Sequence, residues 1–258
     1  MKVVSLEEGY ERDFWDHVNR DPLHYYFFIF DMKQRRDKTR VFLALEGNKV
    51  EGMMLIYAER IVQLRGSQQA MEALFNRVDL KEVELQGPLD CEDIVLRKYR
   101  FWLRYEIVLM QLHKGEENIQ AKHTPVKLGT DDFEEVVDLL RNADPEVWGD
   151  LDAEQQKANW KDAVLVGIRN ENVLVSVGLT RLVDFASNIG AVATDRKYRN
   201  RGLATSVVSS LVQEILKNSP IASIHVRKDN APAIRVYTKV GFEPYKQYLM
   251  VRSSRKGI

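Results

Sequence analysis

The pattern of apolar and polar positions predicts short strands alternating with amphipathic helices along the whole chain. The strongest periodicity follows Gly202, where apolar residues recur at helical spacing. These residues are Leu203, Val207, Val208, Leu211, Val212, Ile215 and Leu216. The spacing places them on one face, so we expect a long helix packed against a sheet.

The first half begins with a helix over residues 5–20, which Asp21-Pro22 interrupts. The aromatic run Tyr25–Phe30 is either a buried helical segment or the wall of a cleft, and core packing is favoured. The remaining segments are expected as a hairpin over 41–45 and 52–57, strands over 61–64, 83–86 and 105–112, and helices over 67–77 and up to 98.

The second half repeats this order more clearly. Its expected elements are a strand over 126–128, helices over 130–141 and up to 160, a hairpin over 164–169 and 173–179, a strand over 185–194, the long helix, a strand over 221–226, a helix over 231–239 and a strand over 248–251. The polar stretch 114–124 is the candidate linker. We therefore predict two domains of similar α+β layout, residues 1–120 and 124–258.

Composition narrows the class of protein. The chain has 258 residues, 45% of them hydrophobic, and 38 basic residues balance 38 acidic ones. A neutral chain without a basic block is not expected to bind nucleic acid. No apolar run approaches the length of a membrane span, and the N-terminal residues do not resemble a signal peptide, so we expect a cytoplasmic protein that does not bind membranes.

The single cysteine, Cys91, excludes an internal disulfide and is expected to be a small buried apolar residue. The five histidines are scattered singly along the chain, so no metal site is predicted.

A candidate phosphate-binding turn lies between the strand ending at Thr194 and the long helix. Arg199, Gly202 and Ala204 form the pattern R-x-x-G-x-A at this junction. The first turn of a helix has unpaired backbone N–H groups, and its dipole favours negative charge. Glycine lets the backbone approach a ligand closely, and the arginines add positive charge. The pattern predicts a site for a pyrophosphate group.

A second motif follows in Asn230, Ala233, Tyr237 and Gly241-Phe242, after the strand that ends near Val226. The two motifs in this order resemble the GNAT superfamily of acetyl-CoA-dependent N-acetyltransferases. The resemblance covers roughly residues 124–252. It implies a mixed, mostly antiparallel sheet flanked by helices, and the coarser pattern of the first half then implies two GNAT-like domains in tandem.

The resemblance also implies which residues hold acetyl-CoA, the expected cosubstrate. The strand before the turn would pair with the pantetheine arm through Val192, Ala193 and Thr194. The pyrophosphate would lie on the turn and helix start, at Arg199, Asn200, Arg201, Gly202, Leu203, Ala204 and Thr205. Asn230 matches the family's asparagine that binds the pantetheine or phosphate portion.

Two further residues are implied in catalysis. Tyr237 matches the family's general acid, since a phenol keeps its proton at neutral pH and can give it to a departing thiolate. The alternative is an interior helix tyrosine that fills the core, and the spacing from Asn230 and Gly241-Phe242 favours the catalytic role. His225 lies where several related enzymes have a glutamate, and it is the candidate general base. A histidine on a strand that is merely hydrogen-bonded is the alternative.

The first half lacks these motifs. Leu64–Ala70 has a glycine before a helix but no complete R-x-x-G-x-A pattern, and nothing near Cys91–Tyr99 matches Asn230 with Tyr237. We expect that this half does not bind CoA.

The acceptor is predicted only as a small-molecule or peptide amine, and a homodimer is left open. The acidic residues of the loop 144–152 around Trp148 either attract a cationic amine or form a solvated loop. These residues are Asp144, Glu146, Asp150 and Asp152. Two other functions stay open: a non-catalytic acyl-CoA-binding regulatory module, and an acyltransferase that joins a longer acyl group to an amino acid.

Overall fold

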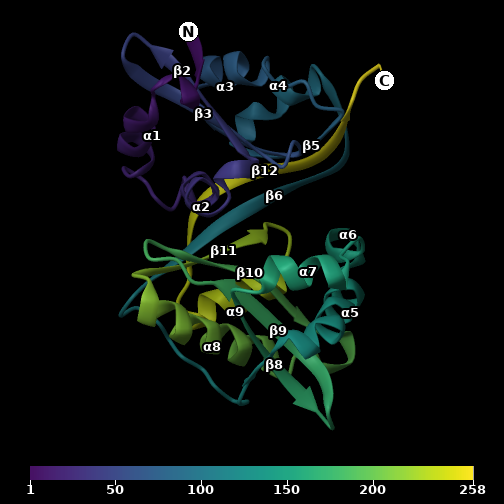
Figure 1. Cartoon of the computed structure of the whole chain (residues 1–258). Helices are drawn as coiled ribbons and strands as arrows, with labels where there is room; N and C mark the ends of the chain where they lie inside the picture. Colours follow the sequence, from purple (N-terminus) through teal and green to yellow (C-terminus); the bar gives the residue numbers. More distant parts are fainter. Residues whose placement is uncertain (258) are drawn as a thin grey trace. The chain divides into compact units, whose positions relative to one another are not determined.

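The computed structural model describes residues 1–257, and the chain divides into two compact units (Figure 1). The first unit contains Met1–Val108, Arg227–Asp229 and the residues from Lys246 onward. The second contains Leu109–Val226 and Asn230–Tyr245. This division differs from the predicted domains 1–120 and 124–258, because the last strand of the chain returns to the first unit.

The first unit is a mixed sheet with helices. Its elements are β1 (Lys2–Ser5), α1 (Glu11–Val18), α2 (Tyr26–Gln34), β2 (Thr39–Glu46), β3 (Lys49–Tyr57), β4 (Ile61–Gly66), α3 (Gln68–Phe75), β5 (Glu82–Gly87), α4 (Glu92–Leu96) and most of β6 (Tyr99–His113). The strand order is β1-β2-β3-β4-β5-β12-β6, where β12 is Glu243–Arg255. The β4–β5 pair is parallel, and the pairs β1–β2, β2–β3, β3–β4 and β5–β12 are antiparallel.

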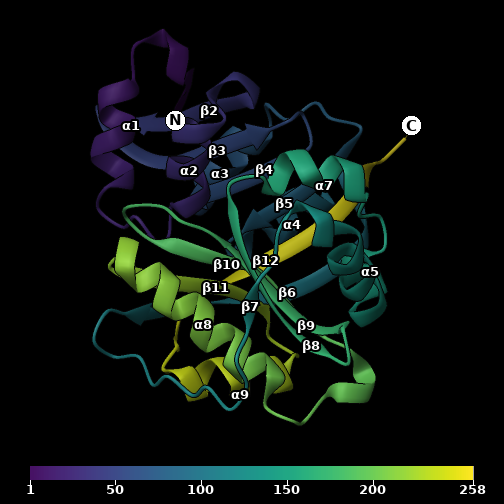
Figure 2. The ribbon, with the colours of Figure 1, turned by 60° about the horizontal axis from the view of Figure 1, so that its bottom comes forward.

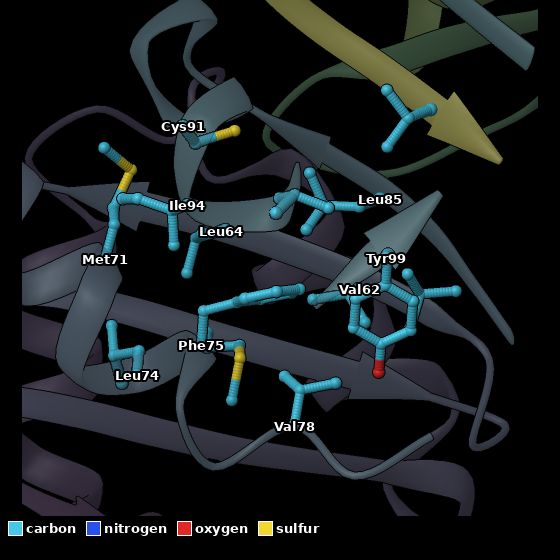
Figure 3. Close-up of a cluster of buried hydrophobic side chains, with 14 of the residues drawn as sticks. Val62, Leu64, Met71, Leu74, Phe75, Val78, Leu85, Cys91, Ile94 and Tyr99 are labelled. Carbon is cyan, nitrogen blue, oxygen red and sulfur yellow. The ribbon is translucent and has the colours of Figure 1, made fainter. Parts of the chain in front are cut away.

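The core of the first unit lies between α3 and one face of its sheet. Alternate residues Val62 and Leu64 of β4 pack here with Met71, Leu74 and Phe75 of α3, all almost fully buried (Figure 3). Cys91 is buried in the same cluster, as predicted. Because side chains alternate along a strand, the intervening residues of β4 point to the opposite face.

The second unit repeats this layout. Its elements are β7 (Val126–Lys127), α5 (Phe133–Ala143), α6 (Pro145–Trp148), α7 (Ala153–Trp160), β8 (Ala163–Asn170), β9 (Val173–Arg181), β10 (Ser187–Thr194), α8 (Leu203–Asn218), β11 (Ile221–Arg227) and α9 (Ala231–Val240). The strand order runs β6-β11-β10-β9-β8-β7, and the β10–β11 pair is parallel.

Helices cover both faces of the second sheet. Val177 and Leu179 of β9 pack in a core cluster with α5 and α7. Gly178 lies between them in sequence and faces α8, since a Cβ there would meet Val207 and Leu211 within 2.8 Å. A side chain at residue 178 would therefore push α8 from the sheet. On that face α8 lies beside α9 (Figure 2).

The last strand of the chain belongs mainly to the first unit. Leu249–Ser254 of β12 pair antiparallel with β5, so the first unit is completed by residues that follow the whole second unit in sequence. In the second unit the place beside β11 is taken by β6. The predicted strand over 248–251 is therefore the middle of a much longer one.

The expected elements are otherwise found with shifted ends. Residues 5–20 split into a short 3-10 helix and α1, and the strand β1 before them was not predicted. Tyr25–Phe30 lies in a buried helical segment, as favoured. Within residues 1–257, no helix combines the length and the apolar character that a membrane crossing requires.

Candidate functional site

The turn between β10 and α8 has a backbone that leaves the helix start open. Asn200 and Gly202 both have left-handed conformations, with φ of 63° and 83°. Gly202 is the N-cap of α8, and no side chain accepts a hydrogen bond from the first helical turn. The backbone N–H groups of Leu203, Ala204 and Thr205 belong to that turn. An anion at this point would meet N–H donors and the positive end of a 16-residue helix.

Positive charge surrounds the same turn. The Arg199 guanidinium donates to the carbonyl oxygens of Thr194 (3.2 Å) and Ala143 (3.3 Å). Arg201 donates to the Lys197 carbonyl oxygen and lies 5.1 Å from the Tyr198 ring. Within residues 1–257, neither arginine forms an ion pair with a carboxylate. The carbonyl oxygens and the ring that contact these arginines carry no charge, so the positive charges of Arg199 and Arg201 can attract an anionic ligand.

The segment 114–124, which was predicted as a linker, contacts α8. The Gln120 and His123 backbone N–H groups donate to Ser209 and Ser206 of α8, each over 3.1 Å. His123 Nε2 lies 2.9 Å from the Arg201 carbonyl oxygen. These residues therefore pack on α8 inside the second unit, whereas the predicted linker would connect the two units.

Lys122 is a site residue that the sequence did not reveal. A Cβ on Gly202 would lie 3.6 Å from its Cδ atom, so the lysine stem passes beside the turn. The residues are 80 positions apart, and the hydrogen bonds of Gln120 and His123 hold the segment beside α8. A polar stretch read by composition alone gives no sign of this.

The strand before the turn separates from its parallel neighbour. Pairing between β10 and β11 covers only Ser187–Ile189 with Ala222–Ile224. A bulge at Gly190 follows, and Val192, Ala193 and Thr194 then pair with β9 alone. The opposite backbone edge of these three residues carries N–H and C=O groups that β11 does not use. Such an edge suits an extended amide-containing ligand such as pantetheine.

Tyr237 lies on α9, which Gly241 ends in a left-handed conformation. Its side chain is 6% exposed, and its ring meets Phe242 edge to face at 6.1 Å. Burial raises the pKa of the Tyr237 phenol above its ordinary value. The hydroxyl therefore stays protonated at neutral pH, as a general acid must.

His225 lies on β11, one residue beyond the last pair with β10. Its Nδ1 is 3.1 Å from Asn188 Oδ1. Asn230 is the N-cap of α9, and its Oδ1 accepts from the Ala233 backbone N–H. The oxygen of Asn230 is thus committed to the helix, which leaves its amide nitrogen as the group that could donate to a ligand.

The acidic loop has a structural role in part. Asp144 and Asp152 accept hydrogen bonds from the first turns of α6 and α7, as N-caps. Trp148 packs against the core cluster of α5 and α7. The expected open loop is therefore a short helix between two caps, and Glu146 and Asp150 are its exposed carboxylates.

The corresponding turn of the first unit is built differently. Ser67 is the N-cap of α3, and its hydroxyl accepts from the Ala70 N–H. Arg65, 1% exposed, donates to the Leu64 and Gln86 carbonyl oxygens over 2.9 and 3.0 Å. These carbonyls lie on β4 and β5, whose parallel pairing ends at Gln63 and Gln86. A guanidinium thus bridges the two strands where they stop pairing.

Comparison with known proteins agrees with this geometry. Residues 165–251 match the family model described as FR47-like protein. A mycothiol acetyltransferase of Brachybacterium faecium is 30% identical over 114 residues, 41% of this chain and 34% of that protein. The matched region thus spans about a third of that relative's length.

Solved structures share the fold at low identity. An acetyltransferase from the GNAT family of Colwellia psychrerythraea is 14% identical, with a TM-score of 0.57 over 98% of this chain and 99% of that one. A tandem GNAT protein from the clavulanic acid biosynthesis pathway is also 14% identical, with a TM-score of 0.52 over 85% and 83%. The predicted tandem of α+β domains is confirmed.

Proposed function

We propose that this chain is an N-acetyltransferase of the GNAT superfamily and moves an acetyl group from acetyl-CoA to a primary amine. The relatives and structural neighbours described above are named acetyltransferases or GNAT proteins. The proposed acyl donor is acetyl-CoA, the acceptor is a primary amine, and the transfer is direct within a ternary complex.

The contrast between the two helix starts carries the proposal. In the first unit, the Ser67 hydroxyl accepts a hydrogen bond from the Ala70 N–H in the first turn of α3. In the second unit, α8 begins at Gly202 without a side-chain cap, beside Arg199 and Arg201. A serine, threonine or aspartate at an N-cap typically stabilises a helix by about 1 kcal/mol. A protein that omits the cap and surrounds the helix start with positive charge has a site suited to phosphate.

The residues of the second unit then have distinct roles. The free edge of β10 would hold the pantetheine amides and place the thioester beside a backbone N–H, which stabilises the oxyanion. His225 would accept the proton of the amine as its nitrogen bonds to the acetyl carbon. The carbon–sulfur bond breaks, and Tyr237 would give its proton to the departing sulfur. Acetyl-CoA is consumed as a substrate, and the products are the acetylated amide and CoA.

The first unit is proposed not to bind acetyl-CoA. Its equivalent strand carbonyl, at Leu64, already accepts from Arg65, and its equivalent helix start is capped. The hydrogen bonds that a ligand would make with this carbonyl oxygen and this helix start are made by the chain's own Arg65 and Ser67 side chains. One equivalent of acetyl-CoA per chain is the expected stoichiometry.

The proposal is tested by titrating the protein with acetyl-CoA in a calorimeter, alongside Gly202→Glu. Gly202 has a φ of 83°, and a glutamate there adds a negative charge and a side chain at the phosphate turn. We expect one equivalent for the wild type and an affinity at least about 100-fold lower for the variant, the effect of roughly 2.7 kcal/mol.

Gly115→Glu is the matched control. Gly115 has a φ of 97°, and a Cβ there would meet no atom within 4 Å. The backbone strain is similar, but Gly115 follows Lys114, whose N–H donates to the Pro220 carbonyl oxygen just beyond the C-terminal end of α8. The residue is therefore at the opposite end of the 16-residue helix from the phosphate turn, and acetyl-CoA binding should be retained. Two equivalents would show that the first unit also binds, and no binding by folded wild type would overturn the proposal. Turnover with a panel of amines, using acetyl-, propionyl- and butyryl-CoA, separates an enzyme from a binding module and fixes the acyl length.

A further inference from the structure

Asn188 connects the two parallel strands of the second unit at the point where they separate. It lies on β10 as the register partner of Ser223 on β11, and His225 is two residues further along that strand. Residues two apart in a strand point to the same face. The Asn188, Ser223 and His225 side chains therefore meet on one face, just before the strands part.

The hydrogen bonds of the amide fix which way it points. Asn188 Nδ2 donates to the Ile189 carbonyl oxygen over 3.2 Å. Its Oδ1 lies 3.4 Å from Ser223 Oγ and 3.1 Å from His225 Nδ1. Turning the amide over would set its oxygen against the Ile189 carbonyl, and two acceptors repel each other. The oxygen therefore faces Ser223 and His225.

This orientation determines the protonation of the imidazole. An amide oxygen can only accept a hydrogen bond, so His225 Nδ1 must be the donor and must carry a proton. A neutral imidazole has one N–H, and its lone pair is then on Nε2. We propose that Asn188 is a positioning residue that holds neutral His225 as the Nδ1–H tautomer and so makes Nε2 the proton acceptor in amine acetylation.

The inference rests on the proposed acetyltransferase function for its chemical use, but the tautomer itself does not. When Nε2 takes the proton of the amine, the ring becomes an imidazolium with both nitrogens protonated. Asn188 Oδ1 still accepts from Nδ1–H, so the product of the proton transfer keeps its hydrogen bond and the ring keeps its orientation. The proton that leaves the amine is thus held at a defined atom of the chain.

The experiment combines nitrogen NMR of the imidazole with kinetics in variants of Asn188. Protein with ¹⁵N-labelled histidine gives two ring resonances for His225, assigned by their loss in His225→Gln. At a pH where the ring is neutral, we expect Nδ1 to have the shift of a protonated nitrogen and Nε2 that of an unprotonated one. Asn188→Leu removes the acceptor at similar volume, and Asn188→Asp keeps an acceptor oxygen.

The expected results separate positioning from a merely structural role. Asn188→Leu should move the neutral ring toward the Nε2–H tautomer and lower kcat at least about tenfold, a part of the roughly 100- to 10,000-fold that general acid–base catalysis contributes. Asn188→Asp should keep the Nδ1–H tautomer and most of kcat. Ser223→Ala, which removes the other donor to the same oxygen, should leave the tautomer unchanged. Acetyl-CoA affinity should be retained in all of them.

A wild-type spectrum with Nε2 protonated in the neutral ring would overturn the inference, as would an unchanged tautomer in Asn188→Leu. If Asn188→Leu does not fold, the wild-type spectrum and Asn188→Asp still decide. If no amine is acetylated, the acetyltransferase proposal fails while the spectrum still reports the tautomer, so the two failures can be told apart.

Discussion

At the scale of single residues, burial sets the protonation of Tyr237, the candidate general acid. Tyr237 is buried on α9, which raises the pKa of its phenol. Among the described residues, its hydroxyl has no hydrogen-bond acceptor, in contrast to Tyr99, whose hydroxyl donates to the Leu80 carbonyl oxygen over 2.8 Å. The Tyr99 hydroxyl already donates its proton to a backbone carbonyl oxygen, which is typical of a structural tyrosine. The Tyr237 hydroxyl can donate its proton to a ligand.

Tyr237→Phe tests this difference. The substitution removes one oxygen from a buried ring that still packs on Phe242. We expect acetyl-CoA affinity to remain and kcat to fall at least about 100-fold, because the proton donor to sulfur is lost. Tyr99→Phe is the matched control, and it should cost about 1 kcal/mol of the free energy of unfolding without lowering kcat. Equal kcat values for the wild type and Tyr237→Phe would remove Tyr237 from the mechanism.

His24 predicts a pH dependence of stability in the first unit. Its Nδ1 lies 2.7 Å from the Tyr248 hydroxyl, and the Arg65 guanidinium lies 4.3 Å from the Tyr248 ring. Burial, with Arg65 and Lys246 nearby, lowers the pKa of His24 from 6.5 to about 3. The unfolded chain therefore binds a proton at His24 that the folded unit does not bind between these pH values.

The free energy of unfolding should thus be highest above pH 6.5 and fall as the pH is lowered toward 3, by up to about 1.4 kcal/mol per pH unit from this residue. Urea unfolding of the wild type and His24→Gln at pH 7 and pH 5 measures it, because the difference between the two proteins isolates His24 from the carboxylates. A difference that does not change with pH would show that His24 titrates normally.

At the scale of elements, the sequence predicted what depends on local pattern. The periodicity after Gly202 predicted the helix that the structure contains as α8. The R-x-x-G-x-A turn was expected between β10 and α8, and it lies there. Strand ends were poorly predicted, because β6 and β12 extend as far as their neighbours pair with them rather than as far as their own alternation runs. The sequence did not predict the positions of Lys122, Asn188 and Arg65 for a related reason. Each of these residues contacts residues that are distant in the chain, namely Gly202, His225 and Gln86.

The two helix starts show how one residue changes the use of a shared element. The helices α3 and α8 occupy corresponding places in the two units. Helix α3 follows β4 and packs against β2, β3 and β4, and α8 follows β10 and packs against β8, β9 and β10. Ser67 closes the first helix start with its own hydroxyl, and Gly202 leaves the second open. The serine of LRGSQQA thus supplies the side chain that caps α3, where α8 has a glycine.

At the scale of the whole molecule, the chain order and the compact units do not coincide. Residues from Lys246 onward belong to the first unit, where Leu249 and Val251 are buried in its core and six residues of β12 pair with β5. A division of the chain near residue 120 therefore takes from the first unit a strand that lies inside its sheet, between β5 and β6. The same cut leaves the second unit without the Leu109–His113 part of β6 beside β11.

We therefore expect that neither residues 1–120 nor residues 124–258 fold alone. Without β12, the first fragment exposes an edge of β5 and loses the burial of two large apolar side chains, which costs about 2–5 kcal/mol for each leucine-sized group removed from a core. That loss is comparable with the whole stability of a domain of this size.

Circular dichroism and urea unfolding of each fragment measure the result. A peptide of residues 243–258 added to fragment 1–120 should restore a cooperative transition, whereas the same peptide with Leu249→Asp and Val251→Asp should not. A cooperative transition in fragment 1–120 without any peptide would mean that the returning strand is an addition to a self-sufficient domain.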